Sequence, residues 1–287
     1  MEEKEKIMTE AERLLRQQRD ERTAAIKRAV PDAAERHRER VAGVAKKITG
    51  GGSTAKVAEK PYRHELKYII SEAEYKILST RLKNTLKPDA FAAKNGGEYF
   101  IRSLYFDDPF DTALEEKFAG VQSRDKFRIR IYDRSDRVIK LERKHKEGAY
   151  IQKSSLSLSR AECDAILAGK PGFLLRRPEP FAKQMYGIFA ANRITPRVIV
   201  DYTREPYVYP VEDVRITFDK NVRTAMRGTD LFDFSAPTYP ATDMVHNMIL
   251  EVKFNRYLPT YVHTLIQLGA SQHVAASKYV ACRRYEF

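Results

Sequence analysis

The sequence has only two cysteines, no long apolar run and no aromatic residue before Tyr62. Each of these features excludes some classes of protein. The two cysteines, Cys163 and Cys282, stand outside any CxxC motif or Cys/His cluster, which argues against a zinc site or a disulfide scaffold and fits a reducing compartment. No stretch approaches the roughly 18 apolar residues of a membrane-spanning helix. The start MEEKEKIMTEAERLL has no apolar core like that of a secretory signal. We therefore expect a cytoplasmic protein without a transmembrane segment.

Aromatic residues are missing from the first part of the chain, because none of the 14 Phe and 16 Tyr residues precedes Tyr62. Residues 2–48 are mostly Ala, Glu, Lys, Arg and Gln, which are strong helix formers, and GGGS at 50–53 has the composition of a flexible linker. We predict a charged helical arm over 1–49, a Gly/Ser linker over 50–60 and a folded domain over 61–287. The arm is either a solvated extension or a helix that contacts another protein.

Positive charge is abundant. The 287 residues include 52 Lys and Arg against 39 Asp and Glu, a net charge of +13, while hydrophobic residues make up 43% and suffice for a sizeable core. A strongly basic protein is expected to bind an anion, which can be nucleic acid, a membrane surface or a free polyanion. Composition alone does not choose among the three.

Short strands dominate after Tyr62. Alternation and β-branched content predict strands over 64–70, 99–107, 126–133, 138–144, 150–156, 197–202, 214–218 and 248–254. Helical patterns separate them over 71–86, where Ser71 can cap the helix, and over 109–118, 159–168, 181–191 and 258–268. Many antiparallel strands with peripheral helices indicate an α+β domain built on a closed or nearly closed antiparallel β-barrel.

Charged residues alternate with apolar ones along several of these strands. In KFRIRI at 126–131, Lys126, Arg128 and Arg130 share one face, and period-two alternation puts Phe127, Ile129 and Ile131 on the other. One such strand simply shows its charges to water, but five strands with repeated cations on one face predict a surface that an anion fills. The same faces carry Glu65, Glu142 and Glu251, carboxylates of the kind that hold Mg²⁺ or Mn²⁺.

Seven motifs in consistent order carry a resemblance to a known family. They are RHELKY at 63–68, SLYFD at 103–107, KFRIRIY at 126–132, LERK at 141–144, YTR at 202–204 with VRITFD at 214–219, LEVK at 250–253, and SKY at 277–279. In these motifs, residues 62–287 resemble the VTC (vacuolar transporter chaperone) polyphosphate polymerase domain. That domain is a branch of the triphosphate tunnel metalloenzymes, also called the CYTH superfamily.

The resemblance implies a tunnel barrel that binds ATP and inorganic polyphosphate together with Mn²⁺ or Mg²⁺. It implies Ser277 and Lys278 at the reacting phosphate, and Glu251, with Glu142 and Glu65, as metal ligands. The implied phosphate-binding residues are Lys67, Arg128, Arg130, Lys144, Lys153, Arg204 and Arg215. Members of the family often have a further Lys shortly before the Ser-Lys pair, where this chain has VAA at 274–276.

The function predicted from the sequence is a metal-dependent polyphosphate polymerase that transfers the γ-phosphoryl group of ATP onto a growing chain. Two alternatives remain open: a tunnel triphosphatase that hydrolyses inorganic triphosphate, and a non-catalytic module that binds polyphosphate or another polyanion. Nucleic acid is not expected as the partner, because no exposed aromatic stacking motif accompanies the basic residues. The sequence identifies no membrane-protein partner.

Overall fold

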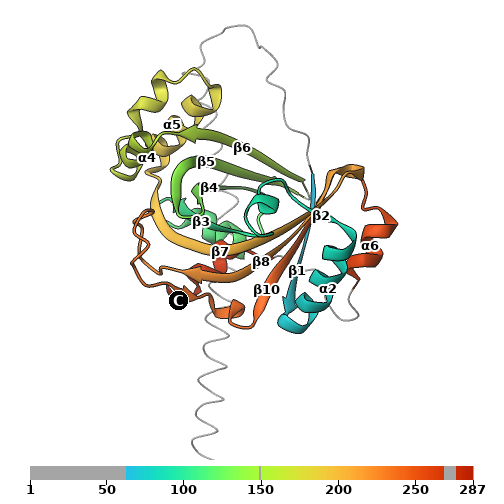
Figure 1. Cartoon of the computed structure of the whole chain (residues 1–287). Coiled ribbons are helices and arrows are strands. Elements are labelled where there is room, and N and C mark those ends of the chain that lie inside the picture. The colour runs from blue at the N-terminus through green and yellow to red at the C-terminus, as the bar shows by residue number, and fades with distance from the viewer. Residues whose placement is uncertain (1–62, 149, 268–275, 287) are drawn as a thin grey trace, which may run out of the picture.

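A large antiparallel sheet flanked by helices forms the body of the protein (Figure 1). The structure is a computed structural model that describes residues 63–148, 150–267 and 276–286. The predicted arm at 1–49 and the linker at 50–60 lie outside the described residues. The α+β class predicted from the sequence is confirmed.

The sheet contains every strand that the sequence predicts. Its order across the sheet is β1 (His64–Ser71), β10 (Asn247–Phe254), β8 (Val214–Thr224), β7 (Thr195–Tyr209), β3 (Tyr99–Asp107), β4 (Ser123–Tyr132), β5 (Ser135–Glu147) and β6 (Tyr150–Leu158). Two short strands complete it, since β2 (Lys87–Pro88) pairs with β7 and β9 (Tyr239–Pro240) pairs with β8. β7 and β8 extend well beyond the predicted ranges.

Helices cover the outer face of the sheet at one end (Figure 1). α2 (Glu72–Thr85) begins after Ser71, which forms a capping box with Glu74, as the predicted N-cap requires. Together with α6 (Thr260–Ile266), α2 buries apolar side chains against β8 and β10, among them Leu78, Phe218 and Val252. Each fully buried Leu or Phe contributes roughly 1.5–3 kcal/mol, so this contact fixes α2 on the sheet.

A second group of helices covers the outer face at the opposite end of the sheet. α4 (Arg160–Leu167), a 3-10 helix (Pro171–Arg176) and α5 (Pro180–Asn192) pack on β4, β5 and β6 (Figure 1). Phe127, Ile129 and Ile131 point into this apolar cluster. Because side chains alternate along a strand, Lys126, Arg128 and Arg130 must lie on the opposite, inner face of the sheet.

The sheet is strongly curved but is not a continuously hydrogen-bonded barrel. Its two edge strands meet at one antiparallel bridge between Arg63 and Ile151, and the Lys144 ammonium on β5 lies 2.8 Å from the Glu65 carboxylate on β1. No further pairing joins β1 to β6 within the described residues. The sequence predicted a closed or nearly closed barrel, and the structure excludes full closure and shows a curled sheet instead. Its right-handed twist brings the edges together at one point only.

The inner face is apolar at one end and charged at the other. The short helix α7 (Lys278–Arg283), which the sequence did not predict, buries Tyr279 and Cys282 against inner-face residues such as Ile101 and Val200. α3 (Thr112–Phe118) adds Leu114 to the same cluster. α7 therefore fills the apolar end and brings Ser277 and Lys278 to the edge of the charged end.

Candidate functional site

The charged end of the inner face gathers nine cationic side chains and four carboxylates from seven strands and α7. Ion pairs and hydrogen bonds link them within the described residues. The cations are Lys67, Lys126, Arg128, Arg130, Lys144, Lys153, Arg204, Lys253 and Lys278, and the carboxylates are Glu65, Glu142, Asp219 and Glu251. We call this set the inner-face charge cluster. Its cations outnumber its carboxylates about two to one, so it favours a bound anion.

Glu65 and Glu251 lie on adjacent strands, β1 and β10, and share one group of lysines. The Lys67 ammonium lies 2.8 Å from the Glu65 carboxylate and 4.0 Å from that of Glu251, while Lys144 pairs with Glu65 and Lys253 with Glu251. Burial and the neighbouring Glu251 raise the pKa of Glu65, but the three lysines outweigh them and hold it below the usual value. Both carboxylates are therefore ionised at neutral pH.

Glu142 on β5 is the centre of a second group. Its carboxylate lies 2.7 Å from the Arg128 guanidinium and 3.7 Å from that of Arg130, and it also pairs with Lys153 on β6. Arg128 donates a further hydrogen bond to the Tyr105 hydroxyl at 2.9 Å. Burial lowers the pKa of Lys153 to about 8, because Arg128 and Arg130 repel its charged form and Glu142 only partly offsets them.

Asp219 on β8 is the centre of a third group and was not assigned a role from the sequence. It is fully buried and receives two hydrogen bonds from the Arg204 guanidinium on β7, at 2.7 and 2.8 Å. Lys278 at the start of α7 pairs with the same carboxylate, and its ammonium lies 4.8 Å from the centre of the Tyr202 ring. Burial raises the pKa of Asp219, but Arg204 and Lys278 lower it to about 2 overall.

Arg215 lies on the same face of β8, but it belongs to a separate contact. Its guanidinium donates to the Asp89 carboxylate at 2.5 Å and to the Tyr99 hydroxyl at 2.9 Å. The structure therefore brings eleven of the twelve predicted site residues into the cluster or against it, and places Arg215 beside them. Lys126, Lys253 and Asp219 are members that the sequence analysis did not assign.

Ser277 is the last of the predicted residues, and it precedes α7. Its hydroxyl accepts a hydrogen bond from the Lys126 ammonium at 2.9 Å. The backbone carbonyl of Ala276, the residue before it, accepts a hydrogen bond from Lys67 at 3.4 Å. Ser277 is therefore held next to cations of β1 and β4.

Side chains outside the charge cluster anchor α7 on the sheet. The Tyr279 hydroxyl donates to the buried Asp107 carboxylate at the end of β3 at 2.6 Å, and Arg283 donates to that hydroxyl at 3.0 Å. Arg283 also makes two hydrogen bonds to Asp111, at 3.1 and 2.9 Å. Burial raises the pKa of Asp107, and the Tyr279 hydrogen bond acts against that rise. These contacts fix the helix that carries Lys278.

We expect Tyr279→Phe to lower both stability and turnover. The change removes one hydroxyl and leaves the Asp107 carboxylate without its strongest donor, which costs about 1–3 kcal/mol in a buried site. Urea unfolding measures the loss, and a phosphoryl-transfer assay measures turnover. Tyr285→Phe is the matched control, because it removes a hydroxyl from a 42% exposed ring and should change stability by less than about 0.5 kcal/mol. Equal effects of the two substitutions would show that α7 is not anchored through Asp107.

The three glutamates predicted as metal ligands do not form one group. Within residues 63–148, 150–267 and 276–286, no three His, Cys, Asp or Glu side chains lie close enough together to hold a metal ion. Glu142 is bound to Arg128, Arg130 and Lys153, whereas Glu65 and Glu251 lie together on adjacent strands. Two carboxylates completed by substrate phosphates are a common donor set for Mg²⁺, so Glu65 and Glu251 fit such an ion.

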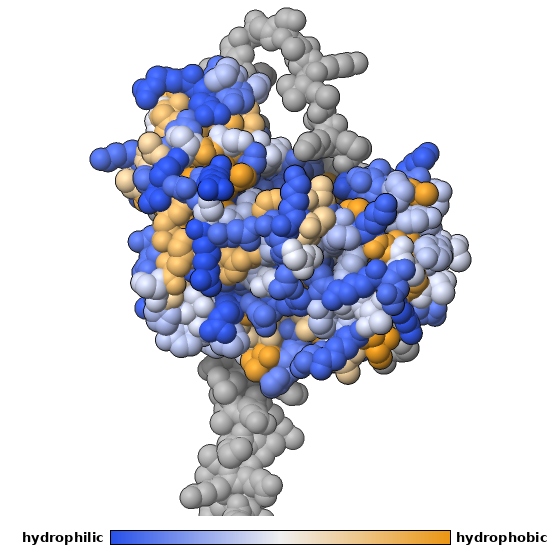
Figure 2. Space-filling model, viewed as in Figure 1, coloured by the Kyte–Doolittle hydropathy of each residue, from blue (hydrophilic) through white to orange (hydrophobic). Residues whose placement is uncertain are grey.

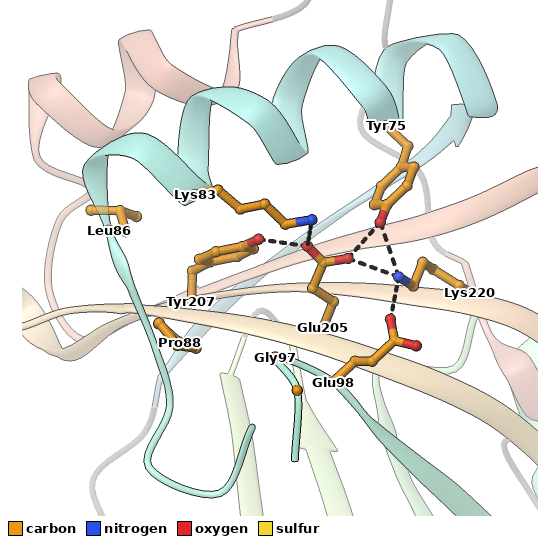
Figure 3. A pocket seen from close by; sticks show the side chains of 10 residues that line it. Tyr75, Lys83, Leu86, Pro88, Gly97, Glu98, Glu205, Tyr207 and Lys220 are labelled. Carbon is orange, nitrogen blue, oxygen red and sulfur yellow. Dashed lines mark hydrogen bonds and ion pairs between the residues drawn. The ribbon is translucent and has the colours of Figure 1, made fainter. Parts of the chain in front are cut away.

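A cavity of about 180 Å³ lies on the outer face of the sheet, beneath α2 (Figure 3). Its centre is the buried carboxylate of Glu205, which lies beside Arg204 in sequence but points to the other face of β7. Glu205 accepts hydrogen bonds from the Tyr75 hydroxyl at 2.5 Å, from Ser79 at 3.1 Å, from Tyr207, and from Lys220 at 2.8 Å. β7 and β8 therefore carry one ion pair on each face, which is Arg204–Asp219 on the inner face and Glu205–Lys220 on the outer face.

Three solved structures resemble the fold. They are a candidate adenylate cyclase of Bacillus halodurans (14% identity, TM-score 0.43, 72% of this chain and 86% of that chain), a protein of Pyrococcus horikoshii (11%, 0.36, 71% and 84%) and a conserved hypothetical protein of Pyrococcus furiosus (9%, 0.36, 71% and 85%). A search of the curated proteins found no match to the sequence. No helix in the described part of the chain is long and apolar enough to cross a membrane.

A family model described as the VTC domain matches residues 62–287. The chain therefore belongs to the VTC domain family, a family of polyphosphate-related tunnel enzymes, and the resemblance seen in the sequence is confirmed. The matched range begins one residue after the predicted start of the folded domain.

Proposed function

We propose that this chain is a metal-dependent polyphosphate polymerase, which transfers the γ-phosphoryl group of ATP to the end of a polyphosphate chain on the inner face. The observation that carries the proposal is the inner-face charge cluster, where nine cations surround four carboxylates on one concave, partly buried surface. Figure 2 shows one side of the molecule, on which hydrophilic residues predominate and apolar residues are scattered among them. Residues from β1, β4, β5, β6, β7, β8 and α7 can contact successive phosphates of an extended chain.

Phosphoryl transfer does not require the protein to form a covalent bond with the substrate. A terminal oxygen of the polyphosphate attacks the γ-phosphorus, a new P–O bond forms, the bond to the β-γ bridging oxygen breaks, and its electron pair leaves with ADP. The attacking oxygen is already ionised, so no general base is needed. Arg128, Arg130 and Arg204 offer paired N–H donors to the non-bridging oxygens, and the lysines offer point charges. Positioning and charge neutralisation supply the catalysis.

The metal site proposed here consists of Glu251 and Glu65. A divalent cation bound there neutralises negative charge on the phosphate oxygens when it is present. The carboxylates are ionised and adjacent, and Lys67, Lys144 and Lys253 hold them in the absence of another cation. Glu142, which the sequence also suggested as a ligand, orients Arg128 and Arg130 in this proposal.

Lys278→Met tests the proposal at the residue nearest the predicted reacting phosphate. Asp219 keeps both hydrogen bonds from Arg204, so the protein should remain folded. If Lys278 neutralises charge that develops in transfer, its loss lowers turnover about 10²–10³-fold. Turnover of ATP with Mn²⁺ is measured beside Lys76→Met, which removes an exposed lysine from α2. A folded Lys278→Met protein with full turnover would overturn the assignment.

A further inference from the structure

Lys126 differs from the other cations of the inner-face charge cluster in its contacts. Eight of them pair with Glu65, Glu142, Asp219 or Glu251. Lys126 forms no ion pair with a described carboxylate. Its ammonium donates instead to the Ser277 hydroxyl at 2.9 Å and lies 5.4 Å from the centre of the Tyr279 ring. The charge of Lys126 therefore lacks a counter-charge among the residues that the structure describes.

The charged side chains with the largest effects on Lys126 are all cations. Lys67 approaches from β1, Arg124 from β4 itself, Lys144 from β5 and Lys117 from α3. α7 contributes only the neutral Ser277 hydroxyl and the Tyr279 ring. Arg124 has Glu116 as an acidic neighbour, and Lys67 and Lys144 pair with Glu65, so their own charges are partly balanced. Lys126 is the place where uncompensated positive charge is concentrated.

This arrangement costs free energy until an anion arrives. Burial lowers the pKa of Lys126 well below its ordinary value, and repulsion from Lys67, Arg124, Lys144 and Lys117 lowers it further. A phosphate group beside the ammonium reverses both effects, because it supplies the missing negative charge and accepts the N–H donors. The Ser277 hydroxyl can then turn toward the same phosphate oxygen, since a hydroxyl is a donor as well as an acceptor.

We propose that Lys126 is a further phosphate-binding residue and that it holds one phosphoryl group of a linear inorganic polyphosphate against Ser277. This inference deepens the proposed function and rests on it only for the nature of the ligand.

Isothermal titration calorimetry with inorganic tripolyphosphate tests the proposal on the full chain. Lys126→Met should weaken binding at least 10-fold. Lys183→Met, which removes an exposed lysine from α5 on the outer side, should leave the affinity close to the wild-type value. Lys126→Met binding tripolyphosphate as tightly as the wild type would overturn the proposal, as would equal losses in the two variants.

Thermal unfolding separates binding from folding. Removing a half-buried cation that has cationic neighbours relieves repulsion, so ligand-free Lys126→Met should melt at the wild-type temperature or above it. A lower melting temperature would contradict the charge argument. Ser277→Ala, which removes only the hydroxyl, provides a second variant and should weaken tripolyphosphate binding less than Lys126→Met does. Since tripolyphosphate binding requires no turnover, a failure of polymer synthesis leaves this test intact, and a failure of this test leaves polymer synthesis open.

Discussion

Asp219→Asn is expected to destabilise the ligand-free protein by about 3–5 kcal/mol, the usual cost of breaking a buried ion pair from one side. The amide keeps the shape of the side chain but leaves Arg204 and Lys278 buried without their shared counter-charge. Because the pKa of Asp219 is lowered to about 2, the carboxylate is ionised throughout neutral pH. The loss should therefore be the same from pH 6 to pH 8, as measured by urea unfolding.

Tripolyphosphate should restore much of that stability, because a bound phosphate replaces the missing negative charge beside Arg204 and Lys278. Ligand that binds only the folded state raises its stability by mass action, so the melting temperature of Asp219→Asn should rise more than that of the wild type. Glu205→Gln is the matched control, since it removes a buried carboxylate from the outer face of the neighbouring strand β7 (Figure 3). We expect it to destabilise the protein without extra rescue by tripolyphosphate. Equal rescue of both variants would contradict binding at the inner face.

Glu251→Gln should lower Mn²⁺-dependent turnover by a factor of about 10² or more while the protein stays folded. The side chain is only 5% exposed, and the amide keeps its shape but removes the charge that a divalent cation needs. Lys67 retains its ion pair with Glu65 at 2.8 Å, which limits the structural loss. Turnover is measured against Mn²⁺ concentration, beside Glu72→Gln at an exposed site on α2.

The competing role for Glu251 is that of a salt bridge, and the structure does contain its pair with Lys253. If that role were the whole function of Glu251, the substitution would leave Lys253 unpaired and lower the melting temperature. Turnover per folded molecule would then stay near the wild-type value at every Mn²⁺ concentration. A destabilised but fully active Glu251→Gln protein would exclude Glu251 from the metal site.

The sequence predicted well which side chains of each strand face the inner or the outer side of the sheet. In β4, the alternation of KFRIRI separates three residues that pack under α5 from three that face inward, and the helical cover confirms it. Once the faces are assigned, Arg128, Arg130 and Glu142 must meet across the β4–β5 ladder, because Arg128 and Glu142 are register partners. Local periodicity assigns the faces, and the β4–β5 register of the structure adds the pairing.

Contacts between distant strands could not be predicted in the same way. Asp219 ends a motif that was recognised, but its contact with Lys278 joins β8 to a six-residue helix near the end of the chain. α7 is too short to show helical periodicity, and its stability comes from Tyr279 and Arg283 packing on the sheet. Nothing in its local sequence marks it as a helix.

The length of β7 was underestimated for a local reason. Its second half, from Thr203 to Tyr209, contains Pro206, and proline inside a run normally argues against a strand. The structure accommodates Pro206 opposite Thr217 of β8. This half of β7, which was not predicted as strand, carries both Arg204 and Glu205. These residues belong to the ion pairs with Asp219 on the inner face and with Lys220 on the outer face.

The central claim is that the protein lengthens polyphosphate chains at the expense of ATP. Incubating the purified chain with γ-labelled ATP and Mn²⁺, then separating the products by gel electrophoresis, tests that claim most directly. We predict label in long polyphosphate and an equal amount of ADP, with none in the Lys278→Met protein. Label found only in orthophosphate would contradict the claim in favour of a triphosphatase, and unreacted ATP beside tight polyphosphate binding would contradict it in favour of a binding module.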